Sequence, residues 1–321
     1  MDGLEAMDGM DGIPDLAPFR GRTVVVKLGG SAMADRDLLR TFAQDVARLH
    51  RAGVRLVVAH GGGPQINAHL EKLGLPVTFT AGLRVTTPET MDVVRMVLAG
   101  QVQRDLVGLL NENGPLAVGI TGEDARLLTA AKRLAVLDGD EVDIGLVGDV
   151  TGVDTHVLRA LTDSGLVPLV TGIGRGTDGQ VYNINADSAA AALAAGLRAD
   201  HLVILTDVPG LYADWPRRDR IVELLTVTRA AELLPELSGG MAPKLESCLR
   251  AVRAGVGRAQ LLDGRVPHAL LHGSFGTGHT GTSVVPDTPL TQLNTLEDDT
   301  CASSPPRPPS SSVCTTSGSG G

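Results

Sequence analysis

The chain has 321 residues, of which 43% are hydrophobic, and it carries a formal net charge of −9. This length allows one large domain or two modest ones with a sizeable core. The negative charge argues against a nucleic-acid-binding protein, and the longest apolar runs fall short of the roughly 18 residues of a membrane helix. The acidic, Gly-rich residues 1–12 lack a signal-peptide pattern, and three cysteines match no metal spacing, so we expect a cytoplasmic protein.

Short apolar runs alternate with segments of helical periodicity along most of the chain. The apolar runs predict buried strands at residues 23–28, 56–60, 115–121, 166–171 and 201–205. The periodic segments predict helices at residues 36–51, 88–113, 156–164, 187–196 and 241–254. Residues 134–155, with Gly-rich turns, predict a β-hairpin. This alternation predicts an α/β fold around a mainly parallel sheet.

The last segment, residues 287–321, differs in composition from the rest. It is rich in Pro, Ser, Thr and Gly and contains the run Ser-Ser-Pro-Pro-Arg-Pro-Pro-Ser-Ser-Ser. Such a segment cannot bury enough apolar surface to offset the entropy of ordering. We therefore expect a disordered tail without a catalytic role.

Two glycine-rich turns follow the first two predicted strands, and each opens a helix. They are Gly29-Gly30-Ser31 and Gly61-Gly62-Gly63. Backbone N–H groups at the positive end of a helix favour anions, and glycine lets a phosphate approach closely. Each turn alone is equally compatible with a simple strand-to-helix connection, but the pair favours phosphate binding. Neither turn has the spacing of a P-loop or of a dinucleotide fingerprint.

Lysine is scarce, since only four of the 28 basic residues are Lys. Lys27 lies inside an apolar strand, where a charge is costly unless it is paired. Lys244 lies in the first turn of the helix at 241–254, where a cation opposes the helix dipole. Two ammonium groups at such positions suit the stabilisation of a transferring phosphoryl group. The alternative for Lys27 is a side chain that extends to the rim of the fold.

Two further charged residues are candidates for the same site. Asp187 opens the Ala-rich helix and would separate the two lysines, although it would equally serve as a helix N-cap or first-turn acid. Arg84 follows Gly82-Leu83 and would hold a carboxylate through two hydrogen bonds, although alone it is compatible with a surface charge. The histidines have no metal-ligand spacing, and His60 is expected to pack or to form a hydrogen bond.

Seven motifs occur in one order, and together they resemble the N-acetylglutamate kinases, a branch of the amino-acid kinase family. The resemblance covers about residues 22–286. The motifs are Val-Val-Lys-Leu-Gly-Gly-Ser at 25–31, His-Gly-Gly-Gly-Pro-Gln-Ile at 60–66, Gly-Leu-Arg-Val-Thr at 82–86, Gly-Leu-Val-Gly-Asp-Val at 145–150, Asn-Ile-Asn-Ala-Asp at 183–187, Leu-Thr-Asp-Val-Pro-Gly-Leu-Tyr at 205–212, and Ser-Gly-Gly-Met-Ala-Pro-Lys at 238–244.

The resemblance implies an open three-layer α/β/α sandwich with a mainly parallel central sheet and two lobes. Residues 22–196 would form the lobe that binds the acetylated amino acid, and residues 197–286 the nucleotide lobe. Residues 1–21 would be a flexible extension. The implied reaction uses ATP with Mg²⁺ to phosphorylate the side-chain carboxylate of N-acetyl-L-glutamate, a step towards ornithine and arginine.

The resemblance also implies a role for each matching residue. Lys27 and Lys244 would stabilise the phosphoryl group, and Asp187 would organise them. The other site residues are the backbone donors Gly29, Gly30, Gly62 and Gly63, the substrate ligands Arg84 and Asn183, and the nucleotide-lobe residues Thr206, Asp207, Gly210 and Leu211. No residue is assigned to a metal, because Mg²⁺ would be carried by the phosphates of ATP.

Two departures from the family pattern concern regulation. Arginine-inhibited members carry an N-terminal helix that joins dimers into a hexamer, whereas here Pro14 and Pro18 interrupt that stretch. Those members also carry a glutamate after the His-x-Leu-Leu stretch, whereas residues 268–274 read His-Ala-Leu-Leu-His-Gly-Ser. We therefore expect a homodimer with weak or absent arginine inhibition. Two alternatives stay open at this point: a kinase of another acylated or carrier-bound acidic amino acid, and a catalytically silent regulator.

Overall fold

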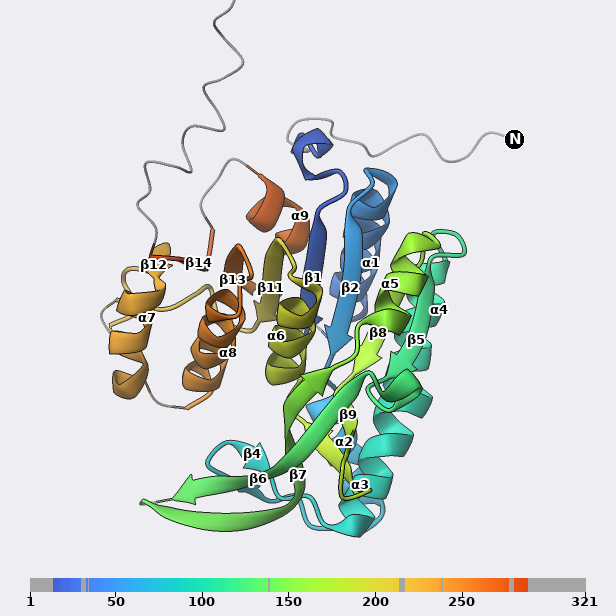
Figure 1. The fold of residues 1–321 in the computed structure, drawn as a ribbon, viewed down its shortest axis with the longest axis vertical. Coiled ribbons are helices and arrows are strands. Elements are labelled where there is room, and N and C mark those ends of the chain that lie inside the picture. The colour runs from blue at the N-terminus through green and yellow to red at the C-terminus, as the bar shows by residue number, and fades with distance from the viewer. Residues whose placement is uncertain are drawn as a thin grey trace, which may run out of the picture. The chain divides into compact units, whose positions relative to one another are not determined.

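A central eight-stranded sheet organises the fold of the protein, of which we obtained a computed structural model (Figure 1). The model describes residues 14–29, 33, 35–137, 139–213, 217–237, 239–276 and 280–287. The strand order is β12-β14-β13-β11-β1-β2-β8-β5, and all neighbouring strands are parallel except β13 and β14. The strands are β1 (Thr23–Leu28), β2 (Arg55–His60), β5 (Ala117–Thr121), β8 (Val167–Thr171), β11 (His201–Thr206), β12 (Leu224–Thr226), β13 (Arg258–Asp263) and β14 (Thr282–Val285). The predicted, mainly parallel central sheet is confirmed.

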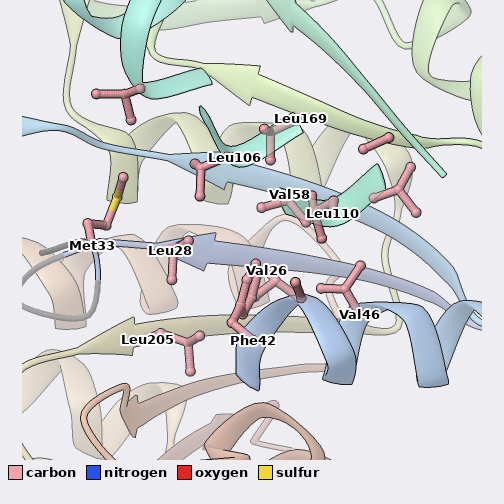
Figure 2. Packing of buried hydrophobic residues seen from close by; sticks show 14 of the residues in the cluster. Val26, Leu28, Met33, Phe42, Val46, Val58, Leu106, Leu110, Leu169 and Leu205 are labelled. Atoms are coloured by element: carbon pink, nitrogen blue, oxygen red, sulfur yellow. The ribbon is translucent and has the colours of Figure 1, made fainter. Parts of the chain in front are cut away.

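Helices cover both faces of this sheet, so the core strands are apolar on both sides. On one face, Val26 of β1 packs in a cluster with Phe42 and Val46 of the longest helix (Figure 2). The helices that contribute to this cluster are α1 (Arg36–Arg51), α2 (Gly63–Lys72), α3 (Pro88–Arg95), α4 (Gln103–Asn111) and α9 (Ala269–Phe275).

The opposite face carries a second core. Because side chains alternate along a strand, Val25 points away from the first cluster and packs with Ala190 and Leu249 in the second. The helices of this face are α5 (His156–Asp163), α6 (Ala186–Leu197), α7 (Val227–Leu233) and α8 (Met241–Arg253). Lys27 has the parity of Val25, so its side chain emerges on the face that α6 and α8 cover.

One long helical segment contains a π-helical stretch, η3 (Met96–Val102), between α3 and α4. The helix predicted at residues 88–113 is therefore confirmed, but its middle is wound more widely than an α-helix. Leu98 and Val102 of η3 pack against Gly62, where an added Cβ would lie 2.6 Å from Leu98 and 3.3 Å from Val102. A close approach to Gly62 thus fixes the position of this segment beside the second glycine-rich turn.

A smaller, closed sheet is formed by strands that lie between β5 and α6 in the sequence. It consists of β6 (Leu128–Leu137), β7 (Asp140–Val153), β9 (Ile173–Gly176) and β10 (Val181–Ile184). The predicted hairpin is confirmed as β6 and β7, which project away from the central sheet (Figure 1). It begins at Leu128, earlier than predicted, because Leu127 and Leu128 are fully buried. A separate hairpin, β3 (Phe79–Thr80) and β4 (Leu83–Arg84), was not predicted.

Short 3₁₀ segments complete the fold of the described residues. Those segments are η1 (Ala17–Phe19), η4 (Asp124–Arg126) and η5 (Leu234–Glu236). Phe19 packs edge-to-face on Phe275 of α9, with ring centroids 4.8 Å apart. Of the flexible extension expected at residues 1–21, residues 1–13 lie outside the described residues, and so do residues 288–321 of the disordered tail expected at 287–321. Because β1 and β11 pair within one sheet, the division into two lobes stays a prediction.

Candidate active site

Two lysines from different elements meet one carboxylate at the carboxyl edge of the central sheet. The Nζ atom of Lys27 lies 2.8 Å from Oδ1 of Asp187. Lys244 donates a hydrogen bond of 3.0 Å from its Nζ atom to Oδ2 of the same carboxylate. The side chains of Lys27 and Asp187 are only 7% and 5% exposed, and that of Lys244 is 17% exposed. The structure thus brings together the three residues that the sequence predicts as catalytic.

Burial and mutual attraction act against each other in this triad. Burial lowers the pKa of Lys27, the neighbouring charge of Asp187 raises it, and the charge of Lys244 lowers it further. For Asp187, burial alone would raise the pKa, but the two lysines together hold it at about 2. The triad carries one net positive charge in a buried setting, which suits it to receive an anion.

The N-terminus of α6 positions Asp187 without using it as a cap. The side chain of Asn185 accepts hydrogen bonds from the backbone N–H groups of Asp187 and Ser188, at 2.8 and 3.2 Å. The N-cap alternative for Asp187 is therefore wrong, because Asn185 fills that role. The carboxylate of Asp187 is free to turn towards the lysines from the first turn of the helix.

The predicted glycines have different structural roles. At Gly29, a Cβ would collide with the ammonium group of Lys27, so glycine gives that side chain its path. Gly62 and Gly63 begin α2, and no side chain caps the first N–H groups of that helix. Gly62 and Gly63 line the cavity described below, so this uncapped helix start lies beside it. Gly30 lies outside the described residues.

The predicted substrate ligands lie together, supported by neighbours that the sequence analysis missed. The Nη2 atom of Arg84 donates to Oδ1 of Asn67 at 2.5 Å and to the carbonyl of Gly63 at 3.3 Å. Its other terminal nitrogen, Nη1, is buried and has no hydrogen-bond partner in the described part of the chain. The Nδ2 atom of Asn183 donates to the hydroxyl of Thr86 at 3.2 Å.

The ring of Phe79 lies 4.8 Å from the guanidinium carbon of Arg84. Burial lowers the pKa of Arg84. Among the ion pairs of the described residues, none involves Arg84, so no carboxylate of the chain offsets its charge there.

Two cavities open beside the triad, and Lys244 lines both of them. The first has a volume of about 290 Å³ and includes Lys27, Arg84, Asn183 and Asp187 in its wall. His60, which also lines it, hydrogen-bonds through Nδ1 to the carbonyl of Gly61, and burial lowers its pKa to about 4.

The second cavity has a volume of about 490 Å³. It is lined by residues that follow β11 and β13 and by the start of α8, where parallel sheets commonly bind ligands. Its wall includes Asp207, Val208, Pro209, Leu211, Tyr212, Arg218, Gly239, Gly240, Met241, Lys244 and Arg265. Two molecules, one in each cavity, would therefore both lie next to Lys244.

Only part of the predicted nucleotide-lobe set lines the second cavity. Asp207 and Leu211 line it, whereas Thr206 and Gly210 are not among its lining residues. Thr206 is buried at the end of β11 and donates to Asp207 at 3.1 Å. At Gly210, a Cβ would lie 2.8 Å from both Ile221 and Thr282, so this glycine permits close packing.

Several lining residues were missed by the sequence analysis. Arg265 lies two residues after the end of β13, and its guanidinium pairs with Asp263 at 2.8 Å. A rule that strand ends carry the site would have found it, but β13 itself was not predicted. Asn67 gave no signal, and Thr86 appeared only as the last residue of the Gly-Leu-Arg-Val-Thr motif without a role of its own. Their contacts with Arg84 and Asn183 arise only from the tertiary fold.

The described residues also bear on membrane and metal sites. No helix there is long and apolar enough to cross a membrane. Within the same residues, His, Cys, Asp and Glu side chains form no group of three or more that would hold a metal ion. The buried Cys248 of α8 is a free thiol whose pKa burial raises above its usual range.

Comparison with known proteins agrees with this geometry, because the sequence model of the amino acid kinase family matches residues 22–263. The chain belongs to the amino acid kinase family. Curated relatives then narrow the assignment, and among them are three acetylglutamate kinases. The protein of Acidothermus cellulolyticus is 58% identical over 86% of this chain and 95% of its own length. Those of Streptomyces griseus and Frankia casuarinae are each 57% identical, over 88% and 87% of this chain and 90% and 80% of their own lengths. Within its family, the chain groups with the acetylglutamate kinases.

Solved structures give the same fold. An N-acetylglutamate synthase from Neisseria gonorrhoeae superposes with a TM-score of 0.73 at 25% identity, over 88% of this chain and 67% of that one. A carbamate kinase from Giardia superposes with a TM-score of 0.61 at 18% identity, over 83% of this chain and 99% of that one. The open α/β/α sandwich that the sequence predicts is thereby confirmed.

Proposed function

We propose that the chain transfers the γ-phosphoryl group of ATP to the side-chain carboxylate of N-acetyl-L-glutamate. The observation that carries this proposal is that Lys244 lines both cavities while it hydrogen-bonds to Asp187. The acceptor acid would occupy the cavity beside Arg84, and the nucleotide the cavity beside Asp207. The acetylglutamate kinases to which the chain is similar support the choice of acid.

The reaction needs no covalent enzyme intermediate. A carboxylate oxygen of the acid forms a bond to the γ-phosphorus, and the bond from that phosphorus to the bridging oxygen of ADP breaks. An acyl phosphate and ADP result, and no proton moves. Negative charge on the transferring group would be stabilised by Lys27 and Lys244 and by the free N–H groups at Gly62 and Gly63.

Asp187 has a different task in this proposal. It is an acceptor only, and its two oxygens lie within 3.0 Å of the two lysine ammonium groups. Because its pKa is about 2, it stays ionised at neutral pH and does not act as a general acid. It would thus fix the two ammonium groups at the spacing that a phosphoryl group requires.

Arg84 would recognise the main-chain carboxylate of the substrate. It is buried, its Nη1 atom has no partner in the described part of the chain, and its bound oxygens belong to neutral groups. A buried guanidinium in this state gains most from a carboxylate that completes a two-pronged interaction. Asn183, 3.2 Å from Thr86, would contact the same molecule.

Mg²⁺ would enter with the nucleotide and would neutralise part of the charge on its phosphates. This ion commonly keeps several waters and substrate phosphates as ligands and requires no cage of side chains. Asp207 and Leu211 would border the nucleotide, and Thr206 and Gly210 would support the same segment from outside the cavity. We place the activity in the cytoplasm and in arginine biosynthesis, as expected for acetylglutamate kinases.

Regulation and assembly are part of the same proposal. In the described residues, 14–21 hold only the three-residue η1, and Leu16 and Phe19 pack against the core. A short, packed segment of this kind supports a homodimer rather than a hexamer joined by N-terminal helices. With residues 268–274 lacking an acid, we expect weak or absent inhibition by arginine.

A hydroxamate assay tests the function. Purified protein is mixed with Mg-ATP, hydroxylamine and either N-acetylglutamate, glutamate or N-acetylaspartate, each with and without millimolar arginine. Hydroxamate formed from N-acetylglutamate alone supports the proposal, and equal rates with arginine support the absence of feedback. Hydroxamate only from another acid would identify a different acidic substrate, and none at all with ATP still bound would point to a silent regulator.

A further inference from the structure

The two substrate ligands proposed above are joined through one partly buried network of hydrogen bonds to neutral groups. The side chain of Thr86 is fully buried, and its hydroxyl donates to the backbone carbonyl of Arg84 at 3.0 Å. The hydroxyl oxygen of Thr86 also accepts the hydrogen bond from Asn183. At the other end of Arg84, Asn67 of α2 accepts from the guanidinium. Four residues from α2, β4, the chain after β4 and β10 are thereby linked.

The chemistry of each group fixes the direction of these bonds. A threonine hydroxyl has one proton, and at Thr86 this proton is committed to the carbonyl of Arg84. Towards Asn183 the hydroxyl therefore acts as an acceptor, which engages the Nδ2 group and turns the amide of Asn183 to one orientation. The amide oxygen of Asn183 is left as an acceptor for the cavity that this residue lines.

Backbone contacts hold Thr86 in place independently of its hydroxyl. Its N–H donates to Ile144 at 2.9 Å, and its carbonyl accepts from Leu146 at 2.7 Å. Gly145, between them, has a φ of +79°, and a Cβ there would collide with the carbonyl of Thr86. The backbone of Thr86 is thus held by hydrogen bonds to β7, and removal of the hydroxyl leaves these bonds in place.

The side chain of Asn67 that contacts Arg84 is neutral. A carboxylate in its place would offset the charge of Arg84 inside the protein and would compete with any anion in the cavity. The amide oxygen of Asn67 fixes the Nη2 side of the guanidinium and leaves its charge uncompensated. Nη1, buried and without a described partner, is then the edge that remains for a ligand.

We propose that Thr86 and Asn67 are positioning residues that orient Asn183 and Arg84 through neutral hydrogen bonds and reserve the charge of Arg84 for the carboxylate of the substrate. This inference rests on the proposed function and deepens it. Neither residue is required to touch the phosphoryl group, so their removal should weaken the binding of the acid far more than it slows the chemical step.

The experiment measures steady-state kinetics and calorimetric binding of N-acetylglutamate for Thr86→Val, Thr86→Ser and Asn67→Asp. For Thr86→Val we expect KM for N-acetylglutamate to rise at least tenfold, kcat to stay within threefold, and KM for ATP to stay within twofold. Thr86→Ser keeps the hydroxyl and should restore KM to within threefold. Asn67→Asp should raise KM for the acid at least tenfold through its added carboxylate.

Matched controls separate positioning from general damage. Thr151 of β7 also donates its hydroxyl to a backbone carbonyl, that of Thr129 at 3.3 Å, but it does not line the cavity. Asn113 is exposed at the end of α4, so Asn113→Asp adds the same charge elsewhere. Both Thr151→Val and Asn113→Asp should leave KM unchanged.

Three outcomes would overturn the proposal. Folded Thr86→Val with unchanged KM, or Thr86→Ser as impaired as Thr86→Val, would refute the role of the hydroxyl. Asn67→Asp with unchanged KM would refute the role of neutrality, and it carries the test if Thr86→Val does not fold. If the unaltered protein binds no N-acetylglutamate, the proposed function itself fails, which the wild-type titration shows separately.

Discussion

At the scale of single residues, the placement of the two lysines proposed as catalytic follows from strand parity and helix position. Lys27 emerges on the face of the sheet that α6 and α8 cover, and Lys244 lies in the first turn of α8. Their scarcity in the sequence was the signal that distinguished them from surface charges. The contacts that orient them were not predictable in the same way, since the capping of α6 by Asn185 frees Asp187 only in the folded chain.

Substitution of either lysine tests the proposed stabilisation of the phosphoryl group. Lys27→Arg or Lys244→Ala should lower kcat by roughly a hundredfold or more, as loss of one transition-state donor does. Arginine does not replace Lys27, because the side chain is enclosed and folds over Gly29, which leaves no room for a planar fork. The measurement is kcat from the hydroxamate assay.

Lys132 offers a control for these variants. It forms an ion pair of 2.7 Å with Asp143 on the exposed part of the β6–β7 hairpin. Lys132→Arg should keep full activity. Near-normal kcat in both Lys27→Arg and Lys244→Ala would remove the lysines from the mechanism.

The neutral variant Asp187→Asn tests the balance of charges around Lys27. Burial is the main cause that lowers the pKa of Lys27, and Asp187 is the main cause that raises it. Without that carboxylate, the pKa should fall further, so Lys27 loses its proton at lower pH. We expect a reduced rate and an alkaline limb of the profile of kcat/KM against pH that shifts towards neutrality. Because Asn185 caps α6, the variant should remain folded, and circular dichroism checks this.

At the scale of elements, the sequence predicted well the strands that are buried on both faces and the helices that are strongly amphipathic. The strands β1, β2, β8 and β11 and the helices α1 and α8 lie within one or two residues of their predicted bounds. Continuous apolar runs are typical of such strands, which explains the agreement. The β3–β4 hairpin was missed because its strands have two residues each. Its turn places Ala81 and Gly82 at positive φ without the Asn-Gly signal of that turn type.

The end of α6 offers a prediction about the stability of one helix. Arg198 ends this helix in a left-handed conformation, with φ of 51° and ψ of 50°. Glycine adopts this conformation without the cost that a Cβ imposes, although it also gains freedom in the unfolded chain. Arg198→Gly should therefore raise the free energy of unfolding by about 0.5–1 kcal/mol, as measured by urea denaturation.

A change of the same type inside a helix should have the opposite sign. Arg159 is an exposed residue within α5, where glycine costs about 1 kcal/mol relative to a good helix former. Arg159→Gly should destabilise the protein. If both variants lowered stability equally, left-handed strain at Arg198 would not be the controlling factor.

At the scale of the whole molecule, two buried histidines link stability to pH. Burial lowers the pKa of His60 to about 4 and that of His201 to about 3, against an ordinary value of 6.5. Below pH 6.5 the unfolded chain takes up protons at both positions, while the folded protein does not until near pH 4. The free energy of unfolding should therefore fall as the pH drops through this window, by up to about 1.4 kcal/mol per pH unit for each histidine.

Urea denaturation at pH 7.5, 6.5, 5.5 and 4.5 measures this slope, and His201→Gln isolates one of its sources. Asp187 contributes little above pH 4, because its lowered pKa of about 2 affects stability only as the pH falls below its ordinary value of 3.8. The exposed His156 gives a matched substitution control, since His156→Gln removes one surface imidazole and leaves both buried histidines in place. We expect a shallower slope for His201→Gln, because the unfolded chain then binds one proton fewer. An unaltered slope in that variant would mean that His201 is protonated in the folded protein and that the acid sensitivity arises elsewhere.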